Sequence, residues 1–288
     1  MLNTRKQIMV FDIETIPDTN LAKNLVGYNG NNINEAREQM TNYHLNITEG
    51  KNPFLRQPFH KIVAISYVKI LVQKSTNDLY LELEDIKSAL TTNATEKELV
   101  SWFFQLIDKH QPGLISFNGR TFDIPVLKYR AMVHGIVGKT FNNSGDKWNN
   151  YNQRYNTTYH YDLIESLSDF GASARIKLNE ICAAFGYPGK FGIDGANVAS
   201  LYDSGKVAEI RNYCETDALN TYLVYLRYAL HSAAITLNVY KDAIKQIINF
   251  IAYSNKEHLN KFHQAWLGAA DSSIDAEIIA TKVDNTVH

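Results

Sequence analysis

Acidic residues occur in the sequence at spacings that could hold a cation. Asp12 and Glu14 lie two apart in the apolar run QIMVFDIETIP, so in a strand both side chains leave the same face, with Cα atoms about 6 to 7 Å apart. Burying two ionised carboxylates is strongly unfavourable unless protonation, an ion pair or a bound cation compensates. No basic residue stands between Val10 and Pro17, which favours the cation. The alternative is that both carboxylates end an edge strand in solvent.

Further candidates lie far along the chain. Asp123 follows the strand-like run GLISFN and begins a helix, where the helix dipole favours negative charge, although it could simply cap that helix. Asn118 ends the same strand, and its amide could bond a sugar or phosphate or could serve only in a turn before Gly119. Tyr213 and Asp217 are four residues apart on a predicted long helix and therefore share one face. Each signal is weak alone, but the set is specific.

The sequence contains three motifs that resemble, in order and at suitable distances, the exonuclease motifs of the DnaQ-like superfamily in its tyrosine-bearing form: FDIET, FNGRTFD and YCETD. The similarity is closest to predicted 3'-5' exonucleases related to the proofreading domain of family-B DNA polymerases. The longer signature of that group resembles GDKWNNYNQRY, HYDL and GKFGIDGANVASLYDSGKVAEIRNYCETDALNTYLVYLR. The resemblance covers roughly residues 8 to 230 and implies a ribonuclease H-like fold.

The resemblance also implies roles for the matching positions. Four carboxylates would bind two Mg²⁺ or Mn²⁺ ions: Asp12, Glu14, Asp123 and Asp217. Because a phosphodiester is anionic and resists hydroxide, two cations about 3.5 to 4 Å apart would hold the nucleophile and steady the leaving oxygen. Carboxylate oxygens suit magnesium or manganese better than zinc. Tyr213 would orient the attacking water, since an unperturbed tyrosine pKa near ~10 makes a poor base at neutral pH.

Contacts with nucleic acid are expected in the segment 120–190, which carries nine Lys or Arg against six Asp or Glu. The run DKWNNYNQRY mixes aromatic and basic residues, a composition suited to stacking on unpaired bases and meeting phosphates, unless it is an ordinary loop whose aromatics pack on the domain. Phe122 could wedge against a terminal base or fill the core. Lys190 could contact phosphate or be a solvated lysine, and Asp162 could orient the site or cap a helix. The candidate substrate contacts are Asn118, Phe122, Trp148, Tyr151, Arg154 and Lys190.

The pattern along the chain predicts an α/β fold with a mixed sheet flanked by helices and a C-terminal helical extension. Strands are predicted at 7–17, 61–72, 78–86, 113–119 and 159–164, with the turn QKSTN joining the second and third. Helices are predicted after a capping box at Thr95 and Glu98, at 122–135, within 163–186, at 206–230 and at 234–267 with a break near 254–255. We expect an exonuclease domain at 1–232, with an insertion at about 18–58, and the extension and tail at 233–288.

Net charge, cysteine spacing and the lengths of apolar runs limit the classes of protein to which this chain can belong. The 288 residues include 29 Lys or Arg and 30 Asp or Glu, so affinity for nucleic acid must come from a local groove. The two cysteines form no C-x-x-C pair, which indicates a reducing compartment and no zinc site. The beginning lacks the features of a signal peptide, and no apolar run approaches ~20 residues, so we expect a cytoplasmic protein without a membrane partner.

The leading hypothesis is a 3'-5' exonuclease acting on single-stranded 3' ends, with DNA favoured over RNA. One alternative is a binding module that keeps the fold without turnover, and another is a proofreading subunit acting beside a polymerase. Helices within 234–267 could pack on the core or offer a surface to a protein partner or a second copy of the chain.

Overall fold

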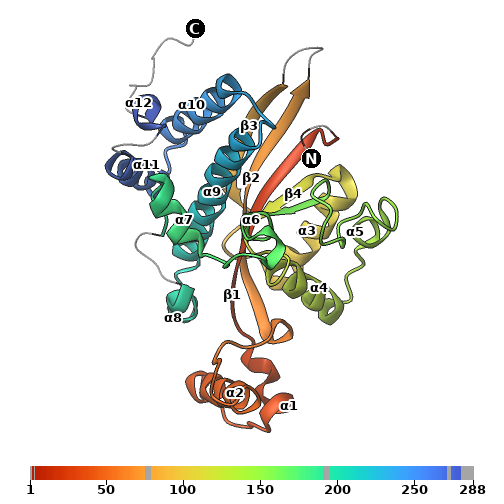
Figure 1. Ribbon diagram of the computed structural model, residues 1–288. Coiled ribbons are helices and arrows are strands. Elements are labelled where there is room, and N and C mark those ends of the chain that lie inside the picture. The colour runs from red at the N-terminus through yellow and green to blue at the C-terminus, as the bar shows by residue number, and fades with distance from the viewer. Residues whose placement is uncertain (1, 3, 75–78, 191–194, 271–273, 280–288) are drawn as a thin grey trace.

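The computed structural model describes residues 2, 4–74, 79–190, 195–270 and 274–279. Within them, five strands form one mixed sheet in the order β3-β2-β1-β4-β5 (Figure 1). The strands are β1 (Gln7–Pro17), β2 (His60–Lys74), β3 (Leu79–Ser88), β4 (Gly113–Ser116) and β5 (His160–Asp162). The first three are antiparallel, and β4 and β5 run parallel to β1. This sheet, with helices on both faces, is the ribonuclease H-like fold class that the sequence predicts.

The central strand β1 is buried because apolar residues occupy both of its faces. Ile8 and Val10 pack in one cluster with the long helix α9 (Val207–His231), whereas Met9 and Phe11 pack in a second cluster with other helices. Side chains alternate between the faces of a strand, so Asp12 and Glu14 continue the face of Ile8 and Val10. The strand therefore directs both carboxylates toward α9.

Helices on the other face include α3 (Glu96–His110), α4 (Asp123–His134) and α5 (Lys139–Asn143). The predicted capping box is confirmed, since Thr95 and Glu98 bond each other reciprocally at the start of α3. Gly135 caps the end of α4, and its φ of 67° is readily adopted only without a side chain. The remaining short helices of this part are α6 (Leu163–Leu167), η3 (Asp169–Gly171), α7 (Leu178–Phe185), η4 (Gly195–Asn197) and α8 (Val198–Asp203).

The predicted insertion forms a helical lobe, residues 18–59, which projects from one end of the sheet (Figure 1). It contains η1 (Thr19–Leu21), α1 (Ala22–Val26), α2 (Ile33–Ile47) and η2 (Gln57–Phe59). A small separate core holds it together: Ala22, Ala36, Met40 and Leu55. The lobe extends from the β1–β2 ribbon, whose register shifts between Glu14 and Thr15 because β2 carries an extra residue, Val63. Such a bulge bends the ribbon locally.

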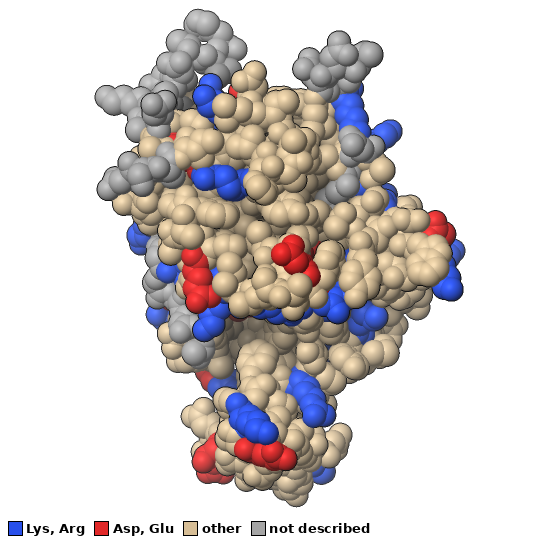
Figure 2. Space-filling model, viewed as in Figure 1, with Lys and Arg blue, Asp and Glu red and all other residues tan. Residues whose placement is uncertain are grey.

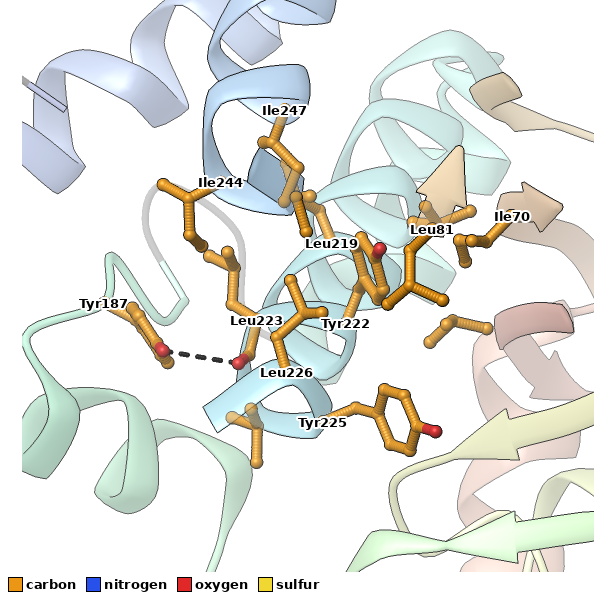
Figure 3. Packing of buried hydrophobic residues seen from close by; sticks show 14 of the residues in the cluster. Ile70, Leu81, Tyr187, Leu219, Tyr222, Leu223, Tyr225, Leu226, Ile244 and Ile247 are labelled. Atoms are coloured by element: carbon orange, nitrogen blue, oxygen red, sulfur yellow. Dashed lines mark hydrogen bonds between the residues drawn. The ribbon is translucent and has the colours of Figure 1, made fainter. Parts of the chain in front are cut away.

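The C-terminal extension packs on the core of the sheet and α9, which was one of its two predicted alternatives. It comprises α10 (Leu237–Tyr253), α11 (Glu257–Ala269) and α12 (Ala276–Ile279), with the predicted break between the first two. Figure 3 shows Ile244 and Ile247 of α10 directed toward Leu219 and Leu223 of α9, in a core that also contains Trp266. The predicted turn at 73–77 and the tail 280–288 lie partly or wholly outside the described residues. None of the described helices is long and apolar enough to cross a membrane.

Candidate active site

Four carboxylates and a tyrosine from three remote parts of the chain meet beside β1. Asp12 and Glu14 come from β1, Asp123 begins α4, and Tyr213 and Asp217 lie one turn apart on α9. Burial raises the pKa of Asp12 well above its ordinary value, and repulsion from the other three carboxylates raises it further. The five residues that the motifs predicted are thus gathered into one site.

The other carboxylates of this site are also difficult to ionise. The pKa of Glu14 is raised well above its ordinary value by burial and then by Asp217. Burial likewise raises the pKa of Asp123 to about 7 and that of Asp217 to about 6, although nearby Lys190 opposes the rise at Asp217. Without a compensating cation, ionising all four groups at neutral pH is unfavourable.

Several buried oxygens of the site have no hydrogen-bond partner in the described part of the chain: Asp123 Oδ1, Asp217 Oδ1 and the Tyr213 hydroxyl. Asp217 is close enough to raise the pKa of Tyr213, yet it does not accept from that hydroxyl with hydrogen-bond geometry. Buried polar atoms are normally satisfied, so these oxygens fit an additional ligand. Carboxylate oxygens that repel one another fit divalent cations such as Mg²⁺ or Mn²⁺.

A thiol adjoins the carboxylates, which sequence reasoning missed. Ligand atoms of Asp12, Glu14 and Cys214 all lie within 4.8 Å of one another. Cys214 Sγ is 3.4 Å from the Asp12 carbonyl oxygen and 3.6 Å from Asp12 Oδ2. One indication in the sequence placed Cys214 near the carboxylates: it follows Tyr213 on the helix that meets β1. Cys214 belongs to no C-x-x-C pair, so cysteine spacing does not identify it.

Asp162 fixes the loop that precedes Asp123. Its carboxylate accepts from the backbone amides of Asn118 at 2.7 Å and Arg120 at 2.9 Å, and from that of Ile164 at 3.2 Å. Both predicted alternatives therefore hold, because Asp162 caps α6 and also orients the motif loop. Asn118 has a φ of 68° and accepts from Thr121 Oγ1 through its own side chain. Asn118 therefore lies in a turn, as one of its two predicted alternatives stated. It also borders the cavity described next.

A cavity of about 860 Å³ opens beside the carboxylates. Its polar lining comprises Asp12, Asn118, Arg175, Lys177, Asn179, Lys190, Asn197 and Asp217. Lys190 Nζ lies 3.7 Å from Asp217 Oδ2 and 5.2 Å from the centre of the Tyr213 ring. Arg175, Lys177 and Asn179 were not predicted individually, although they belong to the segment with excess positive charge. In Figure 2, Lys and Arg side chains border the hollow between the main body and the helical lobe.

Comparison with known proteins identifies the family. Residues 52–266 match the family described as predicted 3'-5' exonuclease related to the exonuclease domain of PolB. The chain belongs to this family. No curated protein matches the sequence. A structurally similar protein is the family B DNA polymerase from the hyperthermophilic archaeon Pyrobaculum calidifontis, with 13% sequence identity and a TM-score of 0.46. The similarity covers 87% of this chain and 29% of the polymerase chain.

The remaining candidate contacts of this member of the PolB-related family lie at different distances from the carboxylates. Phe122 adjoins Asp123 and is half-buried, with its ring against those of His60 and Phe54. Trp148 is 68% exposed. Arg154 bonds Glu165 at 2.7 Å and borders a second cavity, of about 590 Å³. Arg175 lines both cavities and also pairs with Glu165, so these basic side chains form a connected surface.

Tyr151 requires a correction. We expected it to stack on substrate bases, but its side chain exposes none of its surface. The ring stacks on Phe141 with a centroid distance of 5.4 Å, and its hydroxyl donates to the Pro112 carbonyl at 2.8 Å. A buried ring with a satisfied hydroxyl is a structural anchor of the loop. The expectation of an exposed loop was therefore wrong for Tyr151, although it was correct for Trp148.

Proposed function

We propose that this protein is a metal-dependent exonuclease that removes nucleotides from the 3' end of single-stranded nucleic acid, with DNA as the favoured substrate. The observation that carries the proposal is the meeting of four carboxylates and Tyr213 beside a cavity bordered by basic side chains. The preference for DNA rests on the family relationship with the exonuclease domain of a DNA polymerase.

Two Mg²⁺ or Mn²⁺ ions would be held by Asp12, Glu14, Asp123 and Asp217. When bound, they would neutralise phosphate charge and lower the pKa of water enough for attack near neutral pH. The unpartnered oxygens of Asp123 and Asp217 support this ligand set. Asp123 is held for this role by the loop that Asp162 orders.

Tyr213 would position the attacking water by hydrogen bonding. Burial and the neighbouring carboxylates raise the pKa of Tyr213 far above its ordinary value, so the hydroxyl stays protonated at neutral pH. It therefore serves as a poor base but a good orienting group. Its hydroxyl is buried and without a partner among the described residues, which leaves it available for this contact.

The substrate would approach along the basic surface. Lys190, Arg175 and Lys177 border the cavity and can meet phosphates, whereas Asn118 can bond a sugar or phosphate oxygen. Phe122 would wedge against the terminal base. Trp148 and Arg154 would contact nucleotides farther from the cut bond.

The test is degradation of a 5'-labelled single-stranded DNA oligonucleotide by the purified protein alone, with Mg²⁺ or Mn²⁺ added. We expect shortening from the 3' end, inhibition by a 3'-phosphate and loss of activity in Asp12→Ala. Asp242→Ala, which removes an exposed carboxylate on α10, is the matched control and should retain full activity. Unchanged degradation by Asp12→Ala would refute the assignment.

Metal binding is measured separately by calorimetry with Mn²⁺ in the absence of nucleic acid. Oligonucleotide binding without any metal binding would instead favour a non-catalytic binding module. A matched RNA oligonucleotide tests the sugar preference, since recognition of the 2'-hydroxyl distinguishes the two substrates.

A further inference from the structure

Three aromatic rings connect the helical lobe with the carboxylates. We call Phe54, His60 and Phe122 the aromatic ledge. The ring centroids of Phe54 and His60 are 4.9 Å apart, those of His60 and Phe122 are 4.9 Å apart, and those of Phe54 and Phe122 are 5.4 Å apart. Phe122 directly precedes Asp123, so one end of the ledge adjoins the candidate metal ligands.

The ledge is fixed in place by hydrogen bonds at the centre. His60 is buried, its Nε2 lies 2.9 Å from the Leu55 carbonyl, and its Nδ1 lies 3.0 Å from Thr15 Oγ1. With Nε2 protonated, His60 donates to the carbonyl and accepts from the threonine hydroxyl. Thr15 follows Glu14 on β1, so this ring is tied to the same strand as two of the carboxylates.

A second contact links the lobe to the motif loop. Gln57 Nε2 donates to the Thr121 carbonyl at 2.9 Å, two residues before Asp123. The ledge and the carboxylates are therefore held together from both β1 and the start of α4. Phe54 packs against these two held rings, so its side chain loses less conformational freedom on stacking with a ligand than an unsupported side chain would.

Phe54 differs from its two neighbours because its side chain is 55% exposed. Packing within the lobe would bury such a ring, whereas a stacking surface must leave one face open. Arg56 nearby is also exposed and has no ion pair among the described residues. An exposed aromatic ring two residues from an exposed cation is a combination suited to binding unpaired nucleotides, because every base offers a π face and every linkage a phosphate.

We propose that Phe54 is the base-binding residue of the helical lobe, stacking on one unpaired nucleobase near the 3' end of the substrate. This inference rests on the proposed exonuclease function. It assigns the insertion a role in substrate binding, with Arg56 meeting the adjoining phosphate.

The experiment uses a single-stranded DNA oligonucleotide with 2-aminopurine at or next to its 3' end, and Ca²⁺ in place of Mg²⁺ to prevent cleavage. Binding to the full-length protein should quench the fluorescence of the stacked base. Phe54→Ala should raise the Kd by roughly 5- to 150-fold, as expected from losing one base stack, and should reduce the quenching. Phe54→Trp should retain both.

Two further variants separate stacking from packing. Phe54→Leu keeps an apolar side chain but lacks an aromatic face, so it should resemble Phe54→Ala. Tyr253→Ala removes an aromatic residue that is 60% exposed on α10, and it should bind as the wild type does.

The outcomes distinguish this inference from the function on which it rests. The wild type could degrade the oligonucleotide while Phe54→Ala and Phe54→Leu show unchanged binding and quenching. This result would overturn the stacking role of Phe54 and leave the proposed exonuclease function intact. Normal binding by Phe54→Leu but not Phe54→Ala would assign Phe54 a packing role only. A wild-type protein that neither binds nor degrades the oligonucleotide would contradict the proposed function itself.

Discussion

Carboxylates that repel one another make the metal-free site a source of instability. We expect Asp12→Asn to raise the free energy of unfolding in EDTA at neutral pH by about 1 kcal/mol, because it removes a carboxyl group whose raised pKa in the folded protein costs stability at that pH. The same variant should lose the stabilisation that Mn²⁺ gives the wild type. Urea denaturation with and without Mn²⁺ measures both effects. A lower stability of the variant in EDTA would contradict this account.

Tyr213 acts on the water rather than on the cations in the proposed mechanism. Tyr213→Phe should therefore lower kcat by about 100- to 1,000-fold, the range for losing one positioned hydrogen-bond donor, while the affinity for Mn²⁺ stays unchanged. Tyr228→Phe, on the same helix but away from the carboxylates, is the control. Equal loss of metal affinity and activity in Tyr213→Phe would argue against a role limited to water.

The thiol of Cys214 should alter the metal preference of the site. Cys214 Sγ lies 3.6 Å from Asp12 Oδ2. A sulfur and an oxygen that both bind one tetrahedral cation, with bonds of about 2.3 Å and about 2.1 Å to it, are also about 3.6 Å apart. We expect Zn²⁺ or Co²⁺ to bind here, with sulfur ligation visible in the Co²⁺ absorption spectrum and absent in Cys214→Ser. Identical spectra of both proteins would exclude the thiol as a ligand.

Sequence reasoning from the motif spacing correctly brought Asp123 and Asp217 together with Asp12, whereas their roles as metal ligands stay predictions. It could not place Cys214 against Asp12, because 202 positions separate them and only the folded helix joins them. It misjudged Tyr151 because loop sequences carry no periodicity that distinguishes an inward ring from an outward one. Phe54 was not predicted either, because it also lies in a loop of the insertion, where no periodicity shows which way a ring points.

At the scale of elements, the strands and helices were largely predictable. The bounds of β1 were predicted correctly, since a β-branched apolar run ended by proline leaves little choice. The insertion was recognised by its polar composition, but the docking of its helices depends on contacts across the chain. One such contact is the pair of Arg37 on α2 with Asp203 at the end of α8, with an oxygen–nitrogen distance of 2.9 Å.

This ion pair makes the position of the lobe sensitive to acid. Arg37 holds the pKa of Asp203 below its ordinary value of 3.8, so the pair stabilises the protein above that pH, and the contribution is lost as pH falls through the lowered pKa. Asp203→Asn should cost no more than about 1 kcal/mol at pH 7, since the pair is partly exposed. Hydrogen exchange of α2 should increase in this variant at pH 7, and the difference should shrink as the pH falls below 3.8. A difference that does not shrink with falling pH would point to another cause.

For the whole molecule, we propose that residues 233–288 extend the exonuclease domain, 1–232, rather than form a separate unit. The amphipathic pattern of α10 predicted a helix but did not identify what covers it, because an apolar face fits any apolar surface. Ile244 and Ile247 share their core with the sheet and α9.

A shared core implies one cooperative unfolding transition. Trp266→Ala, at a fully buried position of α11, should lower the free energy of unfolding by about 3 to 5 kcal/mol. Circular dichroism and intrinsic fluorescence should report the same midpoint in the wild type. Separate midpoints for the extension and the sheet would show that the two fold independently.

The extra residue Val63 places the bend of the β1–β2 ribbon directly beside Glu14. A continuous paired ribbon, rather than a loose tether, thus sets the spacing between the lobe and the carboxylates of the candidate active site. In the proposed exonuclease, a constant spacing would hold the substrate in the same position relative to the carboxylates in each cycle. We therefore expect successive products to be single nucleotides throughout, and an added residue next to Val63 to broaden that uniform product size.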